Sequence, residues 1–510
     1  MNSTVTHSLC GARWRYQGFV LIAAMVALGV LPVGADDTVT ITPKPQTQGL
    51  VRNPAMGWML YLETGGDSFK PAENFWDAAE PYVGEASILY IRASWSLFEP
   101  QEGHYAWKED ANFQALVAGA QQRHLKLAFR VVANSKDCSA PATPLWVQAA
   151  GAQGYTEKGQ GGRDLWTPTI TDLVFRRKLE NFIKAFAQEF DDPSRVDFID
   201  GCGLGWWGEM DHLNIPSTEC PQTLKWICET YSHSFHHVLL GIQINSELSQ
   251  WGALDNIPLD DYGYVARRDG LGSSWLSEHD REKLSSIYPQ IPFYGESCYF
   301  SLDSWDIWKK DRRHFETIHD VLQATFDDAM TYHANTLDLR APHDAALWNK
   351  EAPDLVTSFI TNAGYRLAPA TIQYPAQFAT DQPFTIQYTW RNLGNGVMPN
   401  DNPRWGKRYR VGFALLNVDS KKPVATAIDP SADPGLWVSG QDWPNTFKAK
   451  FTPAPVAGHY LLALAIVNTE NRNEPEIQIA AEDLKQSNGW SLLGDVQVKA
   501  AETASAPSSP

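Results

Sequence analysis

The sequence predicts an α/β fold, a (β/α)8 or TIM barrel, followed by an all-β sandwich of the immunoglobulin or fibronectin type. Short β-rich runs alternate with helical patterns from about residue 50 to 365, which is typical of βα units. Beyond that point the apolar residues recur at every second position. The 510 residues suffice for both parts. We therefore expect a barrel over residues 36–365, a sandwich over 366–500 and a disordered tail over 501–510.

The first 35 residues have the pattern of a signal peptide. Arg13 and Arg15 precede the apolar run Phe19–Val33, which has the length of a signal core and is short for a membrane span. Small residues follow up to Ala35, after which we expect cleavage. An uncleaved membrane anchor is the alternative. The expected product is exported to the periplasm or the extracellular space and has no membrane attachment after cleavage.

Eight runs rich in β-branched and aromatic residues are expected to form the barrel strands. The amphipathic stripes Phe175–Phe190 and Phe315–Ala329 predict helices that bury one face against the sheet. A doubly wound open sheet is the alternative, but no GxGxxG turn follows the first strand. The expected barrel strands are Met56–Leu62, Ile88–Trp95, Leu127–Ala133, Phe198–Leu204, Val238–Ile244, Tyr262–Arg267, Pro292–Glu296 and Thr336–Arg340.

The C-terminal part has the pattern of a β-sandwich. Phe384, Ile386, Tyr388 and Trp390 alternate with polar residues, as in a strand with one buried face. Turn sequences such as NLGNG and DPSADPG separate the β-rich runs, and no helical stripe lies between them. The further expected strands are Tyr409–Leu416, His459–Val467 and Leu492–Val498.

The formal net charge of −17 comes from 42 basic and 59 acidic residues. It argues against a nucleic-acid partner, which requires a basic footprint. The histidines of the HSFHH run lack the carboxylate of an HExxH site, so we expect no metal, and we expect no cofactor. The oligomeric state stays open.

Cysteine usage leaves the disulfide pairing open. Of the six cysteines, Cys10 lies in the signal segment, and an odd number remains, so at least one thiol is unpaired within the chain. Cys138 and Cys220 could pair in an oxidising compartment. The remaining five are Cys138, Cys202, Cys220, Cys228 and Cys298.

Two glutamates are expected at the carboxyl ends of barrel strands, where (β/α)8 proteins carry their active sites. Glu209 follows the fourth expected strand in GWWGE, and Glu296 ends the seventh in FYGES. Strands four and seven lie across the barrel mouth from each other. Two such carboxyl groups can cleave a glycosidic bond, because one protonates the leaving oxygen while the other attacks the anomeric carbon. A surface or helix-capping role is the alternative for either glutamate alone.

The segment Tyr90–Trp107 (YIRASWSLFEPQEGHYAW) resembles the second-strand region of the retaining (β/α)8 glycoside hydrolases. That clan places an acid/base glutamate after strand four and a nucleophilic glutamate after strand seven. In its NPAMGW, GWWGE and TWRNLGNG phrases the whole chain also resembles a family of exported bacterial proteins of unknown function, in which a barrel precedes a β-sandwich.

The resemblance implies roles for particular residues. Glu209 matches the acid/base, Glu296 the nucleophile and Arg92 the arginine that lies beneath the nucleophile. A cation there would keep Glu296 ionised. Gly208 departs from the clan, which usually has asparagine at this position. The tyrosine that bonds the nucleophile has no clear counterpart, and Tyr262 or Tyr264 on the sixth strand could serve.

Further residues near the expected strand ends are candidate substrate contacts, with core packing or turn formation as the alternative for each. Trp95, Trp207 and Trp348 could stack on sugar faces. The candidates for binding sugar hydroxyls are Asn134, His212, Asn245 and Asp269.

We therefore predict a secreted retaining glycoside hydrolase that acts on a β-linked oligo- or polysaccharide. A catalytically silent carbohydrate-binding protein on the same barrel is the first alternative, and Gly208 motivates it. A purely structural envelope protein, without an open cleft lined by tryptophan, is the second.

Overall fold

The computed structural model describes residues 38–66, 68–244, 254–302, 306–380 and 382–501. These residues belong to one of two compact units of the chain, residues 37–510. The other unit, residues 1–36, holds the expected signal peptide and lies outside the described ranges. The expected tail, apart from Ala501, also lies outside them, as does the candidate Asn245.

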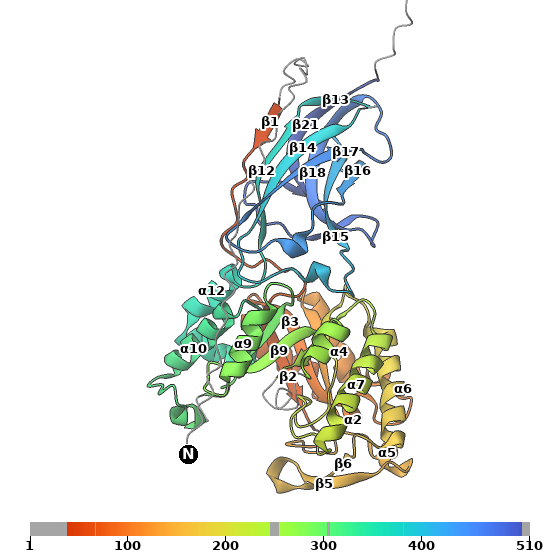
Figure 1. The fold of residues 1–510 in the computed structure, drawn as a ribbon, viewed down its shortest axis with the longest axis vertical. Helices are drawn as coiled ribbons and strands as arrows, with labels where there is room; N and C mark the ends of the chain where they lie inside the picture. The colour runs from red at the N-terminus through yellow and green to blue at the C-terminus, as the bar shows by residue number, and fades with distance from the viewer. Residues whose placement is uncertain (1–37, 67, 245–253, 303–305, 381, 502–510) are drawn as a thin grey trace, which may run out of the picture. The chain divides into compact units, whose positions relative to one another are not determined.

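Eight parallel strands close into a barrel in the order β10-β11-β2-β3-β4-β7-β8-β9, which confirms the predicted (β/α)8 barrel (Figure 1). Each of the eight expected runs overlaps one of these strands. The strands are β2 (Gly57–Thr64), β3 (Ala86–Ser94), β4 (Lys126–Val132), β7 (Val196–Asp200), β8 (Leu239–Gln243), β9 (Val265–Leu271), β10 (Phe293–Ser297) and β11 (Ala334–Arg340).

Amphipathic helices surround the barrel (Figure 1). In α6 (Leu173–Phe190) the Asp172 side chain caps the first turn by accepting from two backbone N–H groups, and the predicted stripe of phenylalanines is buried. The other helices are α1 (Ala72–Ala79), α2 (Trp95–Phe98), α3 (Ala106–Glu109), α4 (Ala111–Gln122), α5 (Leu145–Ala149), α7 (Cys220–Ser234), α9 (Glu278–Ile287), α10 (Ile318–Thr331), α11 (Pro342–Glu351) and α12 (Pro353–Asn362). A hairpin of β5 (Gly154–Lys158) and β6 (Asp164–Pro168) follows α5.

Alternate residues of the barrel strands face the lumen, because side chains alternate along a strand. Phe198 and Tyr294 lie in the lower part of the lumen and are fully buried. Two residues further along the same strands come Asp200 and Glu296. The carboxyl ends of the strands therefore carry a charged layer above an apolar one, and this charged layer forms the floor of the site.

Two packed sheets follow the barrel, as the sequence predicted. The first holds β1 (Thr38–Ile41), β12 (Leu367–Pro375), β14 (Phe384–Asn392) and β17 (Asp442–Ala449). The second holds β13 (Gln377–Ala379), β15 (Tyr409–Asn417), β16 (Pro423–Asp429), β18 (Gly458–Asn468), β19 (Glu474–Ile477), β20 (Gln486–Ser487) and β21 (Trp490–Lys499). The expected alternation in β14 is present, since Phe384, Ile386, Tyr388 and Trp390 are all buried.

Three details differ from the sequence-based expectation. The segment after residue 37 was expected in the barrel, but β1 pairs with β12 of the sandwich and extends its sheet. The fourth barrel strand ends at Asp200 rather than Leu204, because Gly203 and Gly205 take positive φ angles of 72° and 74°. The helix expected from Phe315 begins after Thr317, whose capping box with Asp320 fixes its first turn.

All five cysteines in the described ranges are free thiols, so Cys138 and Cys220 do not pair in this structure. Among the helices that are described, none is both long and apolar enough to cross a bilayer.

Candidate active site

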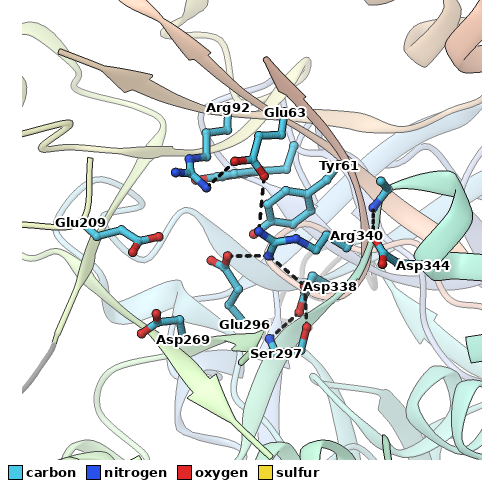
Figure 2. Close-up of polar contacts among 12 residues, drawn as sticks. Tyr61, Glu63, Arg92, Glu209, Asp269, Glu296, Ser297, Asp338, Arg340 and Asp344 are labelled. Atoms are coloured by element: carbon cyan, nitrogen blue, oxygen red, sulfur yellow. Dashed lines mark hydrogen bonds and ion pairs between the residues drawn. The ribbon is translucent and has the colours of Figure 1, made fainter. Parts of the chain in front are cut away.

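A cavity of about 650 Å³ opens at the carboxyl ends of the barrel strands. It brings together five of the predicted residues: Glu209, Glu296, Arg92, Trp207 and Asp269 all line it. Figure 2 shows the carboxyl groups of Glu209 and Glu296 turned toward the same space.

Glu296 stands on β10 and is 3% exposed. Its Oε2 accepts from Nη2 of Arg267 at 2.6 Å, and its Oε1 accepts from Nη1 of Arg340 at 2.9 Å. Burial alone would raise its pKa, but the guanidinium groups of Arg267, Arg130, Arg340 and Arg92 outweigh burial and hold the pKa of Glu296 well below its usual range. Glu296 is therefore ionised over the whole range in which enzymes work.

Glu209 lies in the loop after β7, nine residues beyond the end of the strand. Its Oε1 accepts from Nη1 of Arg130 at 2.5 Å. Burial raises the pKa of Glu209 to about 7; the charge of Arg130 opposes the shift, while Asp269 and Glu296 add to it. This carboxyl group therefore holds its proton up to about neutral pH.

The loop that carries Glu209 depends on left-handed backbone at Trp207, Gly208 and Met210, with φ angles of 55°, 76° and 60°. A Cβ at Gly208 would lie 3.2 Å from Cδ of Arg130. Glycine at this position, where the resembling clan usually has asparagine, therefore allows the loop to pack closely against Arg130.

Arg130 links the two glutamates. Besides Glu209, its Nη2 lies 3.7 Å from Oε2 of Glu296, and its Nε donates to Asp200 at 2.7 Å. Asp200 also accepts from Nη1 of Arg267 at 2.5 Å. Because one guanidinium contacts both Glu209 and Glu296, the two carboxyl groups lie close together across the cavity.

Arg92 was expected to lie beneath the nucleophile and keep it ionised. Instead its Nη1 pairs with Oε1 of Glu63 at 2.9 Å, and Glu63 also pairs with Arg340 at 3.3 Å. Arg92 lowers the pKa of Glu296 only through space. The direct contacts come from Arg267 and Arg340, because these two side chains project into the lumen from the strands on either side of β10.

Two further carboxyl groups complete the charged layer. Asp269 lines the cavity and accepts from Gln243 and Arg268. Asp338, on the neighbouring strand β11, accepts from the backbone N–H and the hydroxyl of Ser297 at 2.7 and 2.9 Å (Figure 2). Burial and the neighbouring Glu296 raise the pKa of Asp338 to about 7.

Three predicted contact residues are core residues instead. Trp95 is fully buried in the first turn of α2 and packs against Trp146 and Phe182. Trp348 packs against Trp58 and is 4% exposed. Tyr264 precedes β9, at the opposite end of the strand from the cavity, and its hydroxyl donates to the carbonyl of Gly201. The suggestion that Tyr264 bonds Glu296 is therefore wrong.

Asn134, His212 and Tyr262 are not among the residues that line the cavity. Asn134 forms a turn by accepting from the Lys136 backbone N–H at 2.8 Å. His212 stacks on Trp206 and pairs with Asp211. Trp207 does line the cavity, and its indole N–H donates to Asp137 at 3.0 Å, which fixes its ring. Tyr262 donates to Glu229, away from Glu296.

Sequence reasoning missed several residues of the charged layer, all of them on barrel strands. The sequence does contain a signal that could have identified them, because each is a charged side chain at a lumen-facing position of an otherwise apolar run. The missed residues are Glu63, Arg130, Asp200, Arg267, Asp338 and Arg340.

Within the described ranges, no group of three or more His, Cys, Asp and Glu side chains is placed to hold a metal ion. The chemistry available at the cavity includes that of the ionised Glu296 and the protonated Glu209 in a partly enclosed space.

No protein-family model and no curated protein matches this chain. Among solved structures, it is similar to endo-glycoceramidase II from Rhodococcus sp., with 12% identity and a TM-score of 0.38 over 80% of this chain and 100% of that one. An endoglucanase from Pseudomonas stutzeri has 9% identity and a TM-score of 0.36 over 63% and 98%. A xylanase from Thermobacillus composti has 10% identity and a TM-score of 0.33 over 55% and 84%.

Proposed function

We propose that this protein is a secreted retaining glycoside hydrolase that acts on a β-linked oligo- or polysaccharide, with Glu209 as acid/base and Glu296 as nucleophile. The observation that carries the proposal is the position of these two carboxyl groups, which line one cavity and contact the same guanidinium of Arg130. A retaining enzyme requires its carboxyl groups about 5–5.5 Å apart, whereas an inverting one separates them by about 6.5–9.5 Å. The shared guanidinium keeps both carboxyl groups within reach of one sugar, and the configuration of the product decides between the two mechanisms.

The electrostatic surroundings of the two glutamates support different roles for them, one as acid/base and one as nucleophile. The two glutamates have pKa values shifted in opposite directions, which is how one site provides an acid and a nucleophile at the same pH. Burial keeps the proton on Glu209, and the surrounding arginines keep it off Glu296. Arg267 and Arg340 hydrogen-bond the two oxygens of Glu296, whereas the charge of Arg130 on Glu209 is outweighed by burial.

In the first step a carboxylate oxygen of Glu296 forms a bond to the anomeric carbon. The bond from that carbon to the leaving oxygen breaks, and the oxygen keeps the electron pair and takes the proton of Glu209. In the second step ionised Glu209 takes a proton from water, the water oxygen bonds to the anomeric carbon, and the bond to Glu296 breaks. Both carboxyl groups return to their starting state, and Arg267 and Arg340 stabilise the carboxylate that leaves.

A catalytically silent carbohydrate-binding protein is the second candidate. Both oxygens of Glu296 accept charge-assisted hydrogen bonds, from Arg267 and Arg340, and such bonds lower the nucleophilicity of a carboxylate. A carboxylate has about four lone-pair sites, so an attacking lone pair remains. Measured turnover decides between the two candidates.

The test is hydrolysis of a panel of β-linked aryl glycosides and polysaccharides by the full chain. We expect activity with retained anomeric configuration in the first product, observed by NMR, and its loss in Glu296→Gln. Glu282→Gln, an exposed position on α9, is the matched control and should stay fully active. No turnover on any substrate, together with measurable glycan binding, would favour the silent protein; product of inverted configuration would rule out the retaining mechanism.

Export is a separate part of the proposal, supported by the basic and apolar pattern of residues 1–35. Sequencing the N-terminus of the protein recovered outside the cytoplasm should give a chain that begins at Asp36. A chain that keeps Met1 and stays in the membrane fraction would instead identify residues 19–33 as an anchor.

A further inference from the structure

A second cavity, of about 920 Å³, lies beside the catalytic one. Its walls come from the segments that follow β9 and β10, so it belongs to the same end of the barrel as the catalytic cavity. Trp275 and the cations Arg281, Lys310 and Arg312 are among the residues that line it. We call it the outer cavity.

Trp275 presents its ring to solvent from a fixed backbone. Trp275 is 68% exposed. In the described ranges, the other large apolar residues that are exposed to this degree are all aliphatic. Its backbone N–H donates to the hydroxyl of Ser273 at 3.1 Å, and its carbonyl accepts from Arg268 at 3.3 Å. Because the backbone is held on both sides, the exposed ring is a preorganised surface.

The cations of the outer cavity are available to a ligand. Lys310 and Arg312 are exposed, and within the described ranges neither forms an ion pair with a carboxylate. Asp311 lies between them but is 5% exposed, and its oxygens accept from Ser274, Tyr299 and Arg313 at 2.5 to 3.0 Å. Asp311 therefore fixes the two loops together. The cavity also holds the carboxylate of Glu278, but among the residues that the structure describes neither Lys310 nor Arg312 pairs with Asp311 or Glu278.

The two cavities share a wall. Cys298 and Phe300 line the catalytic cavity, whereas Tyr299 between them lines the outer cavity. Arg268 makes a second connection, because it donates both to the carbonyl of Trp275 and to Asp269 in the catalytic cavity. A chain of linked sugars is the kind of ligand that could occupy both spaces at once.

We propose that the outer cavity binds an anionic sugar unit, a uronate or a sulfated sugar, of an extended acidic glycan. Trp275 stacks on the apolar face of the sugar ring, and Lys310, Arg312 and Arg281 pair with its carboxylate or sulfate. The inference rests on the proposed function for the place where the glycan is cleaved, and it adds the class of substrate. A neutral glycan would leave the cations unused, and a polyanion without sugar rings would leave Trp275 unused.

The test measures binding by calorimetry to the full chain carrying Glu209→Gln, which blocks the proposed hydrolysis and imitates the protonated side chain. The ligands are an oligogalacturonate, a sulfated oligosaccharide, a neutral cello-oligosaccharide and polyglutamate. We expect one or both acidic oligosaccharides to bind, more weakly as salt is raised. Trp275→Ala, and separately Lys310→Gln with Arg312→Gln, should each weaken this binding about tenfold. The two acidic ligands show whether carboxylate or sulfate is preferred.

The matched control is Lys184→Gln with Lys225→Gln, which removes the same charge from the exposed faces of α6 and α7 and should leave binding unchanged. The proposal is overturned if no acidic oligosaccharide binds, if the outer-cavity variants bind as tightly as their parent, or if polyglutamate binds as tightly as the acidic sugars. Hydrolysis of a short aryl glycoside by Trp275→Ala separates the two proposals. Turnover without outer-cavity binding removes only this inference, and specific binding without turnover in the unmodified chain removes only the hydrolase.

Discussion

The barrel lumen has two layers of opposite character built from the same strands. The lower layer is apolar, and its residues belong to one buried cluster with the sandwich core. The upper layer, about two residues further along each strand, holds a network of arginines and carboxylates. Members of the lower layer are Met59, Ile88, Ala128, Phe198, Val265 and Tyr294, and members of the upper layer are Tyr61, Tyr90, Arg130, Asp200, Arg267 and Glu296.

The difference separates stability from chemistry within one core. Burying an apolar side chain contributes about 1.5–3 kcal/mol to folding and needs no partner. A buried ion pair contributes little net, because desolvation of the two charges opposes their attraction, whereas breaking it by removing one partner is costly. The lower layer therefore stabilises the barrel, and the upper layer keeps carboxyl groups of chosen protonation state at the cavity.

The largest effect is expected from Arg130→Met. The side chain is 1% exposed, and its removal takes away a cation that contacts both Asp200 and Glu209 directly, so that Arg267 remains as the cation bonded to Asp200. We expect a loss of about 3–5 kcal/mol in the free energy of unfolding, measured by urea denaturation. Arg391→Met, which removes an exposed pair with Asp442, should cost about 1 kcal/mol or less. If both variants lost the same free energy of unfolding, the buried ion pairs of the upper layer would matter no more for stability than an exposed pair.

Glu209→Gln should lower turnover while leaving the fold intact, because glutamine has nearly the shape of the protonated acid. We expect a loss of about 10²–10⁴-fold in kcat for a substrate with a poor leaving group. A substrate whose leaving group needs no proton, such as a dinitrophenyl glycoside, should lose far less. If both substrates lose activity equally, Glu209 does not act as the acid.

The pH dependence of hydrolysis should reflect the different protonation states of Glu209 and Glu296. Glu209 must be protonated for the first step, and its pKa is raised to about 7, so kcat/KM should fall as the pH rises through about 7. Glu296 must be ionised, and its pKa lies below the usual range, so no loss from Glu296 is expected as the pH falls toward 5. In Glu209→Gln the descending limb should disappear. A limb that persists in this variant would belong to another group, and Asp338 is the first to examine.

Sequence reasoning reached the fold and the two central glutamates but little of what surrounds them. The eight strands and the alternation in β14 follow from local apolar patterns, which the barrel and the sandwich both satisfy. Arg130 and Arg267 sit inside such runs, and their importance comes from partners 70 and 67 residues away along the chain. Trp95 fails for a related reason, because α2 begins at that residue and turns the ring into the core.

The smallest effect is expected in the lower layer. Ile88→Val removes one methylene from a side chain that is 0% exposed and carries no polar group. We expect a loss of about 0.5–1.5 kcal/mol in stability, with kcat and the pH profile of hydrolysis unchanged. Tyr90→Phe, two residues along the same strand, removes the hydroxyl that Asp200 accepts from and should alter the pH profile, because the shared arginines then redistribute between Asp200 and the two glutamates. A change of pH profile in Ile88→Val as large as that in Tyr90→Phe would show that the layers act as one, since packing alone would then set the protonation of the site.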